Sequence, residues 1–386
     1  MSNTNQTITE TFFRLIRLAV GPSPADNCLD EVTLTEEERK QIISLAKAHD
    51  LIPIITSALA KQNLLNPATA KNVQIQTVWR YEKLNHELEQ ICGVLEKHEI
   101  DYIPLKGSVI RPYYPEPWMR TSCDIDILVH EEDLEQMAKV LIQDLSYTLE
   151  SKTGFHHISM HAPNGIHLEP HFNLREDVEK MDRVLDEVWE NSTSSGINHR
   201  FEQTNEFLVF HIIAHMAYHF QSGGCGIRPF IDLYLLDKKL DYNRDKLMDF
   251  CRRAGIERFY ECVRQMIDVW FNEADHTDVT RRMEDFVLSG GVYGTKSNAV
   301  AIQQERAGNK FRQILTRIFM PYQSLKIKYP ILIRHPWMTP IFEVVRWVKM
   351  ICKKRLGKSC REFEMICGLS EERRAEIGRL LDDVGL

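Results

Sequence analysis

Hydrophobic and polar positions alternate in only a few short parts of the chain. Residues 123–129 read Cys-Asp-Ile-Asp-Ile-Leu-Val, and this alternation predicts a strand, because successive side chains of a strand point to opposite faces. Residues 155–161 and 166–171 alternate in the same way around a turn at 162–165, so we expect a β-hairpin there. Two shorter strands are expected at 102–105 and 147–150.

Apolar residues recur at helical spacing over most of the remaining chain, which predicts helices on both sides of these strands. The expected helices cover 9–20, a segment after the capping residue Thr35, 68–99, 131–144, 207–220 and a segment that begins near Arg228. Few strands are expected after about residue 205. The pattern predicts an α+β fold: an N-terminal helical region, 1–66, a core that contains the strands, 67–200, and a C-terminal helical domain, 201–386.

Composition and charge narrow the class of protein. The chain has 386 residues, 43% of them hydrophobic and 27% charged, which is typical of a globular protein with more than one domain. A net charge of -7 argues against a wholly basic nucleic-acid binder. The nine cysteines lack the close pairing of a zinc site and favour a reducing cytoplasm. We expect neither a signal peptide nor a transmembrane segment.

Two acidic residues lie within the otherwise apolar strand at 123–129. Asp124 and Asp126 share one face of that strand, and two neighbouring carboxylates repel each other unless a cation lies between them. Mg²⁺ is a hard cation that prefers oxygen ligands. Glu169 shares a face of the second hairpin strand with His167 and His171, and it is the candidate third carboxylate. The alternative is a pair of solvated acids at a strand end.

A second candidate feature precedes this strand. The strand at 102–105 leads through Lys106 into Gly107-Ser108 and an apolar segment with helical spacing. Strand, Gly-Ser and helix form a phosphate-binding arrangement, because glycine allows close approach and a helix N-terminus favours negative charge. Ser108 can either cap the helix or bind a phosphate oxygen.

These residues resemble the nucleotidyltransferase superfamily typified by DNA polymerase beta, which has Gly-Ser, then Asp-x-Asp on one strand, then an acid on an adjacent strand. The chain is most similar to a large bacterial group of uncharacterised nucleotidyltransferase-like proteins. The shared features are Leu-Lys-Gly at 105–107, Tyr-Pro at 114–115, Arg120 and Asp-x-Asp-x-Leu-Val at 124–129. The longer gap between Ser108 and Asp124, and the Lys106 before Gly-Ser, depart from the superfamily pattern.

The resemblance implies a polymerase-beta-like core, a small mixed sheet with helices. It also implies transfer of a nucleoside monophosphate from an NTP to a hydroxyl acceptor, with release of pyrophosphate and with Mg²⁺ or Mn²⁺ as cofactor. The acceptor would be a small molecule, a protein or RNA. By the same resemblance, the catalytic and metal-binding residues are Asp124, Asp126 and Glu169, the nucleotide-binding residues are Lys106, Gly107, Ser108 and Arg120, and the acceptor-side residues are His215, Arg228 and Asp232.

Three alternatives stay open. The histidines at 156, 157, 161, 167 and 171 are a candidate zinc cluster, although they alternate between strand faces. His211, His215 and His219 have helical spacing, which is typical of zinc ligands but also of core or groove histidines. A non-catalytic protein that binds a nucleotide or a partner, for example in a toxin–antitoxin pair, is the alternative to an enzyme.

The last third of the chain is rich in basic and aromatic residues. Lys326, Lys328, Arg334, Arg346, Lys349, Lys353, Lys354, Arg355, Lys358 and Arg361 are interleaved with Tyr329, Trp337, Phe342 and Trp347. This composition predicts a weak contact with a polyanion such as RNA, or with an anionic membrane surface. The alternative is a solvated basic face of a helical domain.

Overall fold

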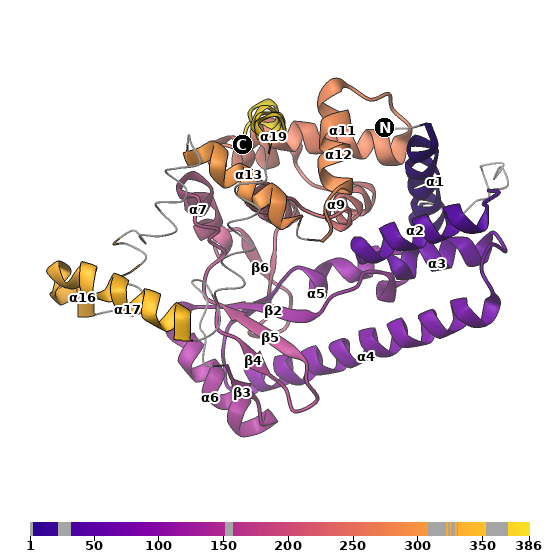
Figure 1. Ribbon diagram of the computed structural model, residues 1–386. Coiled ribbons are helices and arrows are strands. Elements are labelled where there is room, and N and C mark those ends of the chain that lie inside the picture. Colours follow the sequence, from indigo (N-terminus) through magenta and orange to yellow (C-terminus); the bar gives the residue numbers. More distant parts are fainter. Residues whose placement is uncertain are drawn as a thin grey trace.

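The chain folds into a mixed α+β structure, which confirms the predicted class (Figure 1). The computed structural model describes residues 3–21, 32–150, 157–292, 294–307, 322, 325, 329, 331–352 and 370–386. In the view of Figure 1 the sheet lies in the lower part of the molecule, and α4 (Pro67–Lys97) extends beside it. Helices from both ends of the chain gather in the upper part.

A five-stranded sheet with the order β1-β2-β5-β4-β3 positions the acidic residues. Its strands are β1 (Tyr102–Pro104), β2 (Asp124–Val129), β3 (Thr148–Leu149), β4 (Met160–His161) and β5 (His167–His171). β2 pairs antiparallel with β1 and parallel with β5, and in the parallel register Asp126 lies opposite Glu169. The hairpin strand that carries Glu169 therefore lies directly beside the strand that carries both aspartates.

Helices make up most of the rest of the described chain. The N-terminal helices are α1 (Asn3–Val20), α2 (Glu36–Ala48) and α3 (Ile52–Lys61), followed by α4; α5 (Gly107–Ile110), α6 (Leu134–Leu145) and α7 (Glu179–Leu185) belong to the middle of the chain. The later helices are α8 (Asn205–Ser222), α9 (Arg228–Lys239), α10 (Arg244–Ala254), α11 (Glu257–Asn272), α12 (Asp278–Leu288), α13 (Lys296–Ala307), α16 (Ile331–Arg334), α17 (Thr339–Cys352) and α19 (Glu371–Val384). As predicted, Thr35 caps α2, and the structure adds that it forms a capping box with Glu38.

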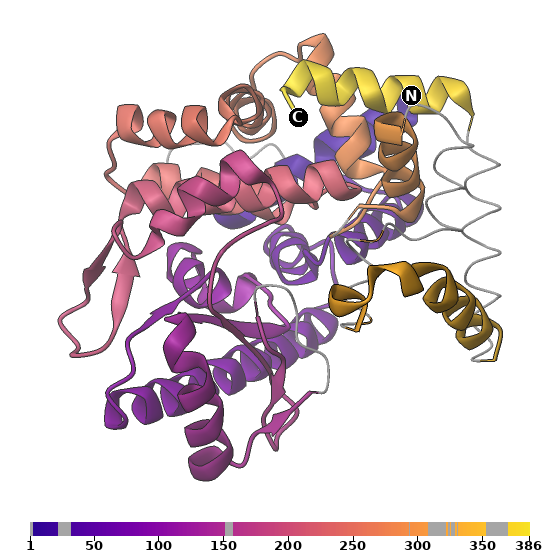
Figure 2. The ribbon, with the colours of Figure 1, turned by 90° about the vertical axis from the view of Figure 1, so that its left-hand side faces the viewer.

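Two apolar cores hold these elements together. One lies between the sheet, α4 and α6, and it buries Ile125, Ile127 and Val129, the face of β2 opposite Asp124 and Asp126. The other core contains residues of α1, α2 and α3 together with residues of the later helices. In this core the Phe13 ring of α1 stacks on Trp270 of α11, with ring centroids 4.4 Å apart. Figure 2 shows α19 along the upper side of the molecule, where it packs against α12 and α13.

Three local expectations were wrong. The helix that begins at Gly107 has four residues and passes into a 3-10 turn at Arg111–Tyr113, because Pro112 lacks the N–H that a longer helix needs. Strand β4 is much shorter than the predicted 155–161, of which residues 155 and 156 lie outside the described residues. A second hairpin, β6 (Ser192–Ser194) with β7 (Phe201–Gln203), was not predicted.

No helix in the described ranges has both the length and the apolar character needed to cross a lipid bilayer.

Candidate active site

Asp126, Glu169 and His171 meet where β2 pairs with β5. The His171 Nε2–H donates to Asp126 Oδ1 over 2.9 Å, and the same nitrogen lies 3.8 Å from Glu169 Oε2. Asp126 and His171 are both buried. One ligand atom from each residue lies within 4.8 Å of the others, so this group can hold a metal ion.

The charges of neighbouring side chains shift the pKa values of Asp126 and Glu169. Burial opposes ionisation of Asp126, but the Lys106 ammonium and the hydrogen bond from His171 outweigh burial and hold the pKa of Asp126 well below its usual range. Burial and the Asp126 charge raise the pKa of Glu169. Two carboxylates whose pKa values move apart are typical of a functional site, where one stays ionised while the other can take a proton.

Asp124 belongs to a neighbouring group that shares Glu169. Asp124, His167 and Glu169 also offer ligand atoms within 4.8 Å of one another, and His167 Nδ1 lies 3.6 Å from Glu169 Oε1. Ser122 Oγ donates to the Asp124 backbone carbonyl over 2.8 Å and also lies 3.2 Å from Asp124 Oδ1, so Ser122 fixes the start of β2. Each of the two groups offers two carboxylates, one of them from the shared Glu169, and one imidazole. Such a set fits a divalent cation such as Mn²⁺ or Mg²⁺, for which carboxylate oxygens are the preferred ligands.

Lys106 connects this acidic group to the rest of the site. Its Nζ lies 3.0 Å from Asp126 Oδ1. Burial opposes protonation, but the charge of Asp126 raises the pKa of Lys106, so the ammonium stays charged. The Lys106 backbone has φ 45°, a left-handed value that is rare for lysine. Strain of this kind costs about 1–3 kcal/mol and is typical of functional sites.

Gly107 and Ser108 lie at the start of α5, but the geometry differs from a simple phosphate cradle. A side chain at Gly107 would approach Arg120 Nη1 to 3.0 Å and Arg111 Nη2 to 3.3 Å, so glycine leaves room for two guanidinium groups. Ser108 does not cap the helix, and its buried Oγ has no hydrogen-bond partner among the described residues. Burial, followed by the nearby Arg120 charge, lowers the pKa of Arg111 to about 10.

Arg120 and Asp232 form a buried ion pair between the sheet-bearing part and α9. Arg120 Nε and Nη2 donate to the two Asp232 oxygens over 2.9 and 2.8 Å, and the Tyr114 hydroxyl donates to Asp232 Oδ1 over 2.7 Å. Asp232 is therefore held by two partners and is poorly suited to accept a proton from an acceptor. Arg120 Nη1 takes no part in these two bonds and lies near Gly107.

Asp232→Ala should destabilise the protein by about 3–5 kcal/mol, because it leaves the buried Arg120 charge without its partner. Urea unfolding measures this loss. Asp186→Ala is the matched control: Arg175 binds Asp186 with the same two-bond geometry, but both side chains are more than one-third exposed. That control should cost less than about 1 kcal/mol. Equal effects of the two substitutions would contradict a structural role for the buried pair.

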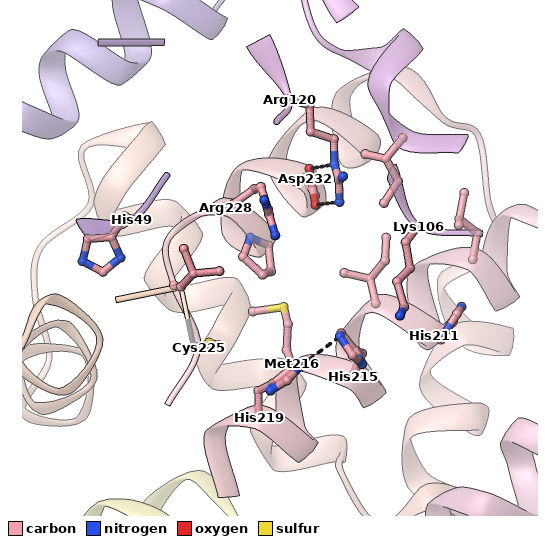
Figure 3. A pocket seen from close by; sticks show the side chains of 16 residues that line it. His49, Lys106, Arg120, His211, His215, Met216, His219, Cys225, Arg228 and Asp232 are labelled. Atoms are coloured by element: carbon pink, nitrogen blue, oxygen red, sulfur yellow. Dashed lines mark hydrogen bonds and ion pairs between the residues drawn. The ribbon is translucent and has the colours of Figure 1, made fainter. Parts of the chain in front are cut away.

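A cavity of about 90 Å³ is lined by Lys106 and Arg120 together with residues of α8 and α9 (Figure 3). The three predicted acceptor-side residues, His215, Arg228 and Asp232, all line it. His211 and His219 line it too, so these α8 histidines are groove residues, which was one of the expected alternatives. The tertiary structure therefore brings together residues that are more than 100 positions apart in the sequence.

His215 has partners that sequence reasoning did not find. Its Nδ1 lies 2.6 Å from Glu176 Oε1, and its Nε2 lies 3.0 Å from His219 Nε2. Burial and the nearby His215 lower the pKa of His219 to about 3. Arg228 Nη1 donates to Asp50 Oδ2 over 3.3 Å and to the Thr121 carbonyl over 3.0 Å. Nothing in the local sequence around Glu176 or Asp50 signals these contacts.

Acidification should destabilise the protein through His49, which also lines the cavity and is fully buried. Burial lowers the pKa of His49 from 6.5 to about 4. Between these values the unfolded chain binds a proton that the folded chain does not, so the free energy of unfolding falls as the pH falls. At pH 5 the expected loss from His49 is about 2 kcal/mol relative to pH 7.

Urea unfolding of His49→Gln at both pH values tests this, with exposed His86→Gln as the control. The difference between pH 7 and pH 5 should shrink by about 2 kcal/mol in the first variant alone. An unchanged pH dependence in His49→Gln would show that burial of this ring does not control acid stability. His211, whose pKa burial also lowers, should supply part of the remaining dependence.

The zinc alternative has limited support. His161 and His167 form a group with Glu150 in which ligand atoms also lie within 4.8 Å, but two of its members are exposed. His156 lies outside the described residues, as do seven of the basic residues of the C-terminal segment, namely Lys326, Lys328, Lys353, Lys354, Arg355, Lys358 and Arg361. The polyanion contact predicted for that segment stays a prediction.

Comparison with solved structures gives two distant similarities. The antibiotic-resistance factor ANT(2'')-Ia is 11% identical, with a TM-score of 0.32 over 46% of this chain and 93% of that chain. An antigenic nucleotidyltransferase-like protein from Paracoccidioides brasiliensis is 14% identical, with a TM-score of 0.34 over 52% of this chain and 96% of that chain. These TM-scores are too low to support an argument about fold or function.

Comparison with protein families gives a match that covers more than half of the chain. No curated protein matches significantly. The family described as uncharacterised nucleotidyltransferase matches residues 35–272, a range that contains β1 to β5 and the cavity-lining helices α8 and α9. The resemblance drawn from the Gly-Ser and Asp-x-Asp motifs is thereby confirmed at the level of the family, and the chain belongs to this family of nucleotidyltransferases.

Proposed function

We propose that the protein transfers a nucleoside monophosphate from an NTP to a hydroxyl acceptor in a reaction that depends on a divalent cation. The observation that carries this proposal is the parallel register of β2 and β5, which sets Asp126 opposite Glu169. Two of the groups that can hold an ion, one with Asp124 and one with Asp126, share Glu169. When bound, Mg²⁺ or Mn²⁺ supplies charge stabilisation for the attacking and leaving oxygens.

In the proposed reaction the acceptor oxygen forms a bond to the α-phosphorus, and the bond from that phosphorus to the bridging oxygen breaks. Pyrophosphate leaves with the electron pair, and the acceptor hydroxyl loses its proton. Glu169 is the proposed proton acceptor, because burial and the Asp126 charge raise its pKa toward a value suited to this role. Asp126, whose pKa is held low, stays ionised as a ligand.

The positive side chains indicate where the triphosphate of the NTP would bind. Lys106 lies between Asp126 and the cavity, and Arg228 lines the same cavity. A volume of about 90 Å³ suits a phosphate group better than a whole acceptor molecule. We therefore propose that His215 and Arg228 face the phosphates of the NTP, and that Asp232 acts by holding Arg120 in place.

Labelled NTPs test the proposed function directly. The pure protein is incubated with each labelled NTP, with Mg²⁺ or Mn²⁺, and with a cell extract that supplies acceptors. We expect one class of molecule to become labelled and pyrophosphate to be released in equal amount. Tight binding of an NTP without any labelled product would instead favour the alternative, a non-catalytic protein that binds a nucleotide or a partner.

A further inference from the structure

A groove of about 540 Å³ lies between α4 and the turn that joins β4 to β5. Its lining includes Trp79, Arg80 and Lys83 from α4, together with Gly165 and Cys123. Cys123 directly precedes Asp124, so the groove begins beside the proposed metal-binding residues. The volume lies in the range of small-ligand sites, about 300–1,000 Å³.

The aromatic side chain in this groove is unusually exposed. Trp79 is 65% exposed, and Ile75, one helical turn earlier, is 55% exposed. Leu84 is the first buried residue of α4, so the preceding four turns present these side chains outside the apolar cores. A large exposed aromatic group gains little from folding of the chain itself, and its flat face suits stacking on another ring.

Two cations flank Trp79. Lys83 Nζ lies 5.3 Å from the centroid of the Trp79 ring and donates to the Asn164 carbonyl over 2.7 Å. Arg80 Nε donates to the Ser122 carbonyl over 3.1 Å, and Ser122 Oγ in turn binds Asp124. The described residues that line the groove include no carboxylate. Arg80 therefore connects the groove to Ser122, which contacts Asp124.

We propose that this groove binds single-stranded nucleic acid as the acceptor, with a base stacked on Trp79 and backbone phosphates near Arg80 and Lys83. The inference rests on the proposed transfer reaction. A positive groove combined with an aromatic platform is the usual design of single-strand binding sites. An NTP carries its phosphates together, and Lys106 with Arg228 already faces them from the cavity. Arg80 and Lys83 form a second positive site, in the groove. That site suits a nucleic acid, which carries one phosphate for each nucleotide.

Fluorescence anisotropy of a short labelled oligoadenylate tests the groove at low salt, without metal or NTP. We expect binding to the parent protein and binding about 10- to 100-fold weaker in Trp79→Ala, the loss expected for one stacked base. Trp79→Phe should restore most of the affinity. Ile197→Ala is the control, because Ile197 is a 45% exposed apolar residue of the β6–β7 hairpin that does not line the groove.

The dependence on salt tests the cations separately. Lys83→Gln should lower the slope of log affinity against log salt by about one, because one phosphate contact is lost. No binding of the oligonucleotide to the parent, or equal losses in Trp79→Ala and Ile197→Ala, would overturn the proposal. Weaker binding of NTP with Mn²⁺ in Trp79→Ala, with unchanged oligonucleotide binding, would assign the groove to the base of the NTP and would also overturn it.

Failure of this inference can be told apart from failure of the proposed function. Asp126→Asn should keep oligonucleotide binding while it loses metal-dependent NTP binding. Trp79→Ala should weaken oligonucleotide binding while it keeps metal-dependent NTP binding. A protein that transfers nucleotides normally with Trp79→Ala and binds no oligonucleotide would keep the proposed reaction and lose only the nucleic-acid acceptor.

Discussion

Asp126→Asn should abolish metal-dependent binding of an NTP. The carboxylate belongs to the group formed with Glu169 and His171, and an amide removes one negative charge from it. The Lys106 ammonium, 3.0 Å away, would then repel an incoming cation without an opposing charge. We expect a loss larger than the about 10- to 100-fold that follows removal of an outer-shell partner.

Isothermal titration with Mn²⁺ and a non-hydrolysable NTP measures this loss. Asp275→Asn is the control, because Asp275 is exposed and lies outside the candidate site. Circular dichroism checks that the Asp126→Asn fold is intact, since Asp126 is buried and holds both Lys106 and His171. Unchanged binding by a folded Asp126→Asn protein would remove the metal site from this part of the sheet.

Glu169→Gln should separate catalysis from nucleotide binding. If Glu169 accepts the proton of the acceptor hydroxyl, its replacement should lower kcat about 100- to 10,000-fold, the range for loss of a general base. Most NTP binding should remain, because Asp124 and Asp126 keep their carboxylates. A group used mainly in the transition state affects turnover more than ground-state binding.

Single-turnover transfer and NTP titration on the same preparation check this separation. Glu135→Gln is the control, since this glutamate lies on α6 with an 86% exposed side chain. Full transfer by Glu169→Gln would require another base. Asp232 is a poor candidate, because Arg120 and Tyr114 occupy its oxygens. A parallel loss of NTP binding and transfer would make Glu169 primarily a metal ligand.

The two outcomes together distinguish an enzyme from a protein that only binds nucleotides. The proposed enzyme predicts that Asp126→Asn loses NTP binding and that Glu169→Gln loses turnover. A binding protein has no turnover to lose. Its shared group of carboxylates would then serve only to hold a metal–nucleotide complex.

Local sequence patterns predicted the elements that carry the site. A strand repeats every two residues, so the alternation at 123–129 was enough to place Asp124 and Asp126 on one face and Ile125 and Ile127 in the core. The capping box at Thr35 and Glu38 is equally local, because both groups lie within one helical turn. The length of the helix that begins at Gly107 was overestimated, although Pro112 was visible in the sequence.

The partners of these residues could not be predicted in the same way. The bond between Arg120 and Asp232 spans 112 positions, and that between His215 and Glu176 spans 39. Such pairs depend on how helices pack against the sheet, and a single sequence carries no periodic signal for them. The exposure of Trp79 is equally invisible, since an aromatic residue on a helix is usually expected in a core.

The sequence by itself determined the α+β class, the motif that led to the family, and the two faces of β2, because each depends on spacing along a few residues. Only the tertiary structure decided that β2 and β5 run parallel with Asp126 opposite Glu169. It also decided that Lys106 neutralises Asp126 and that Lys106 lines a cavity with residues of α8 and α9. These features arise from burial and charge pairing between distant segments, and those forces act only once the chain has folded.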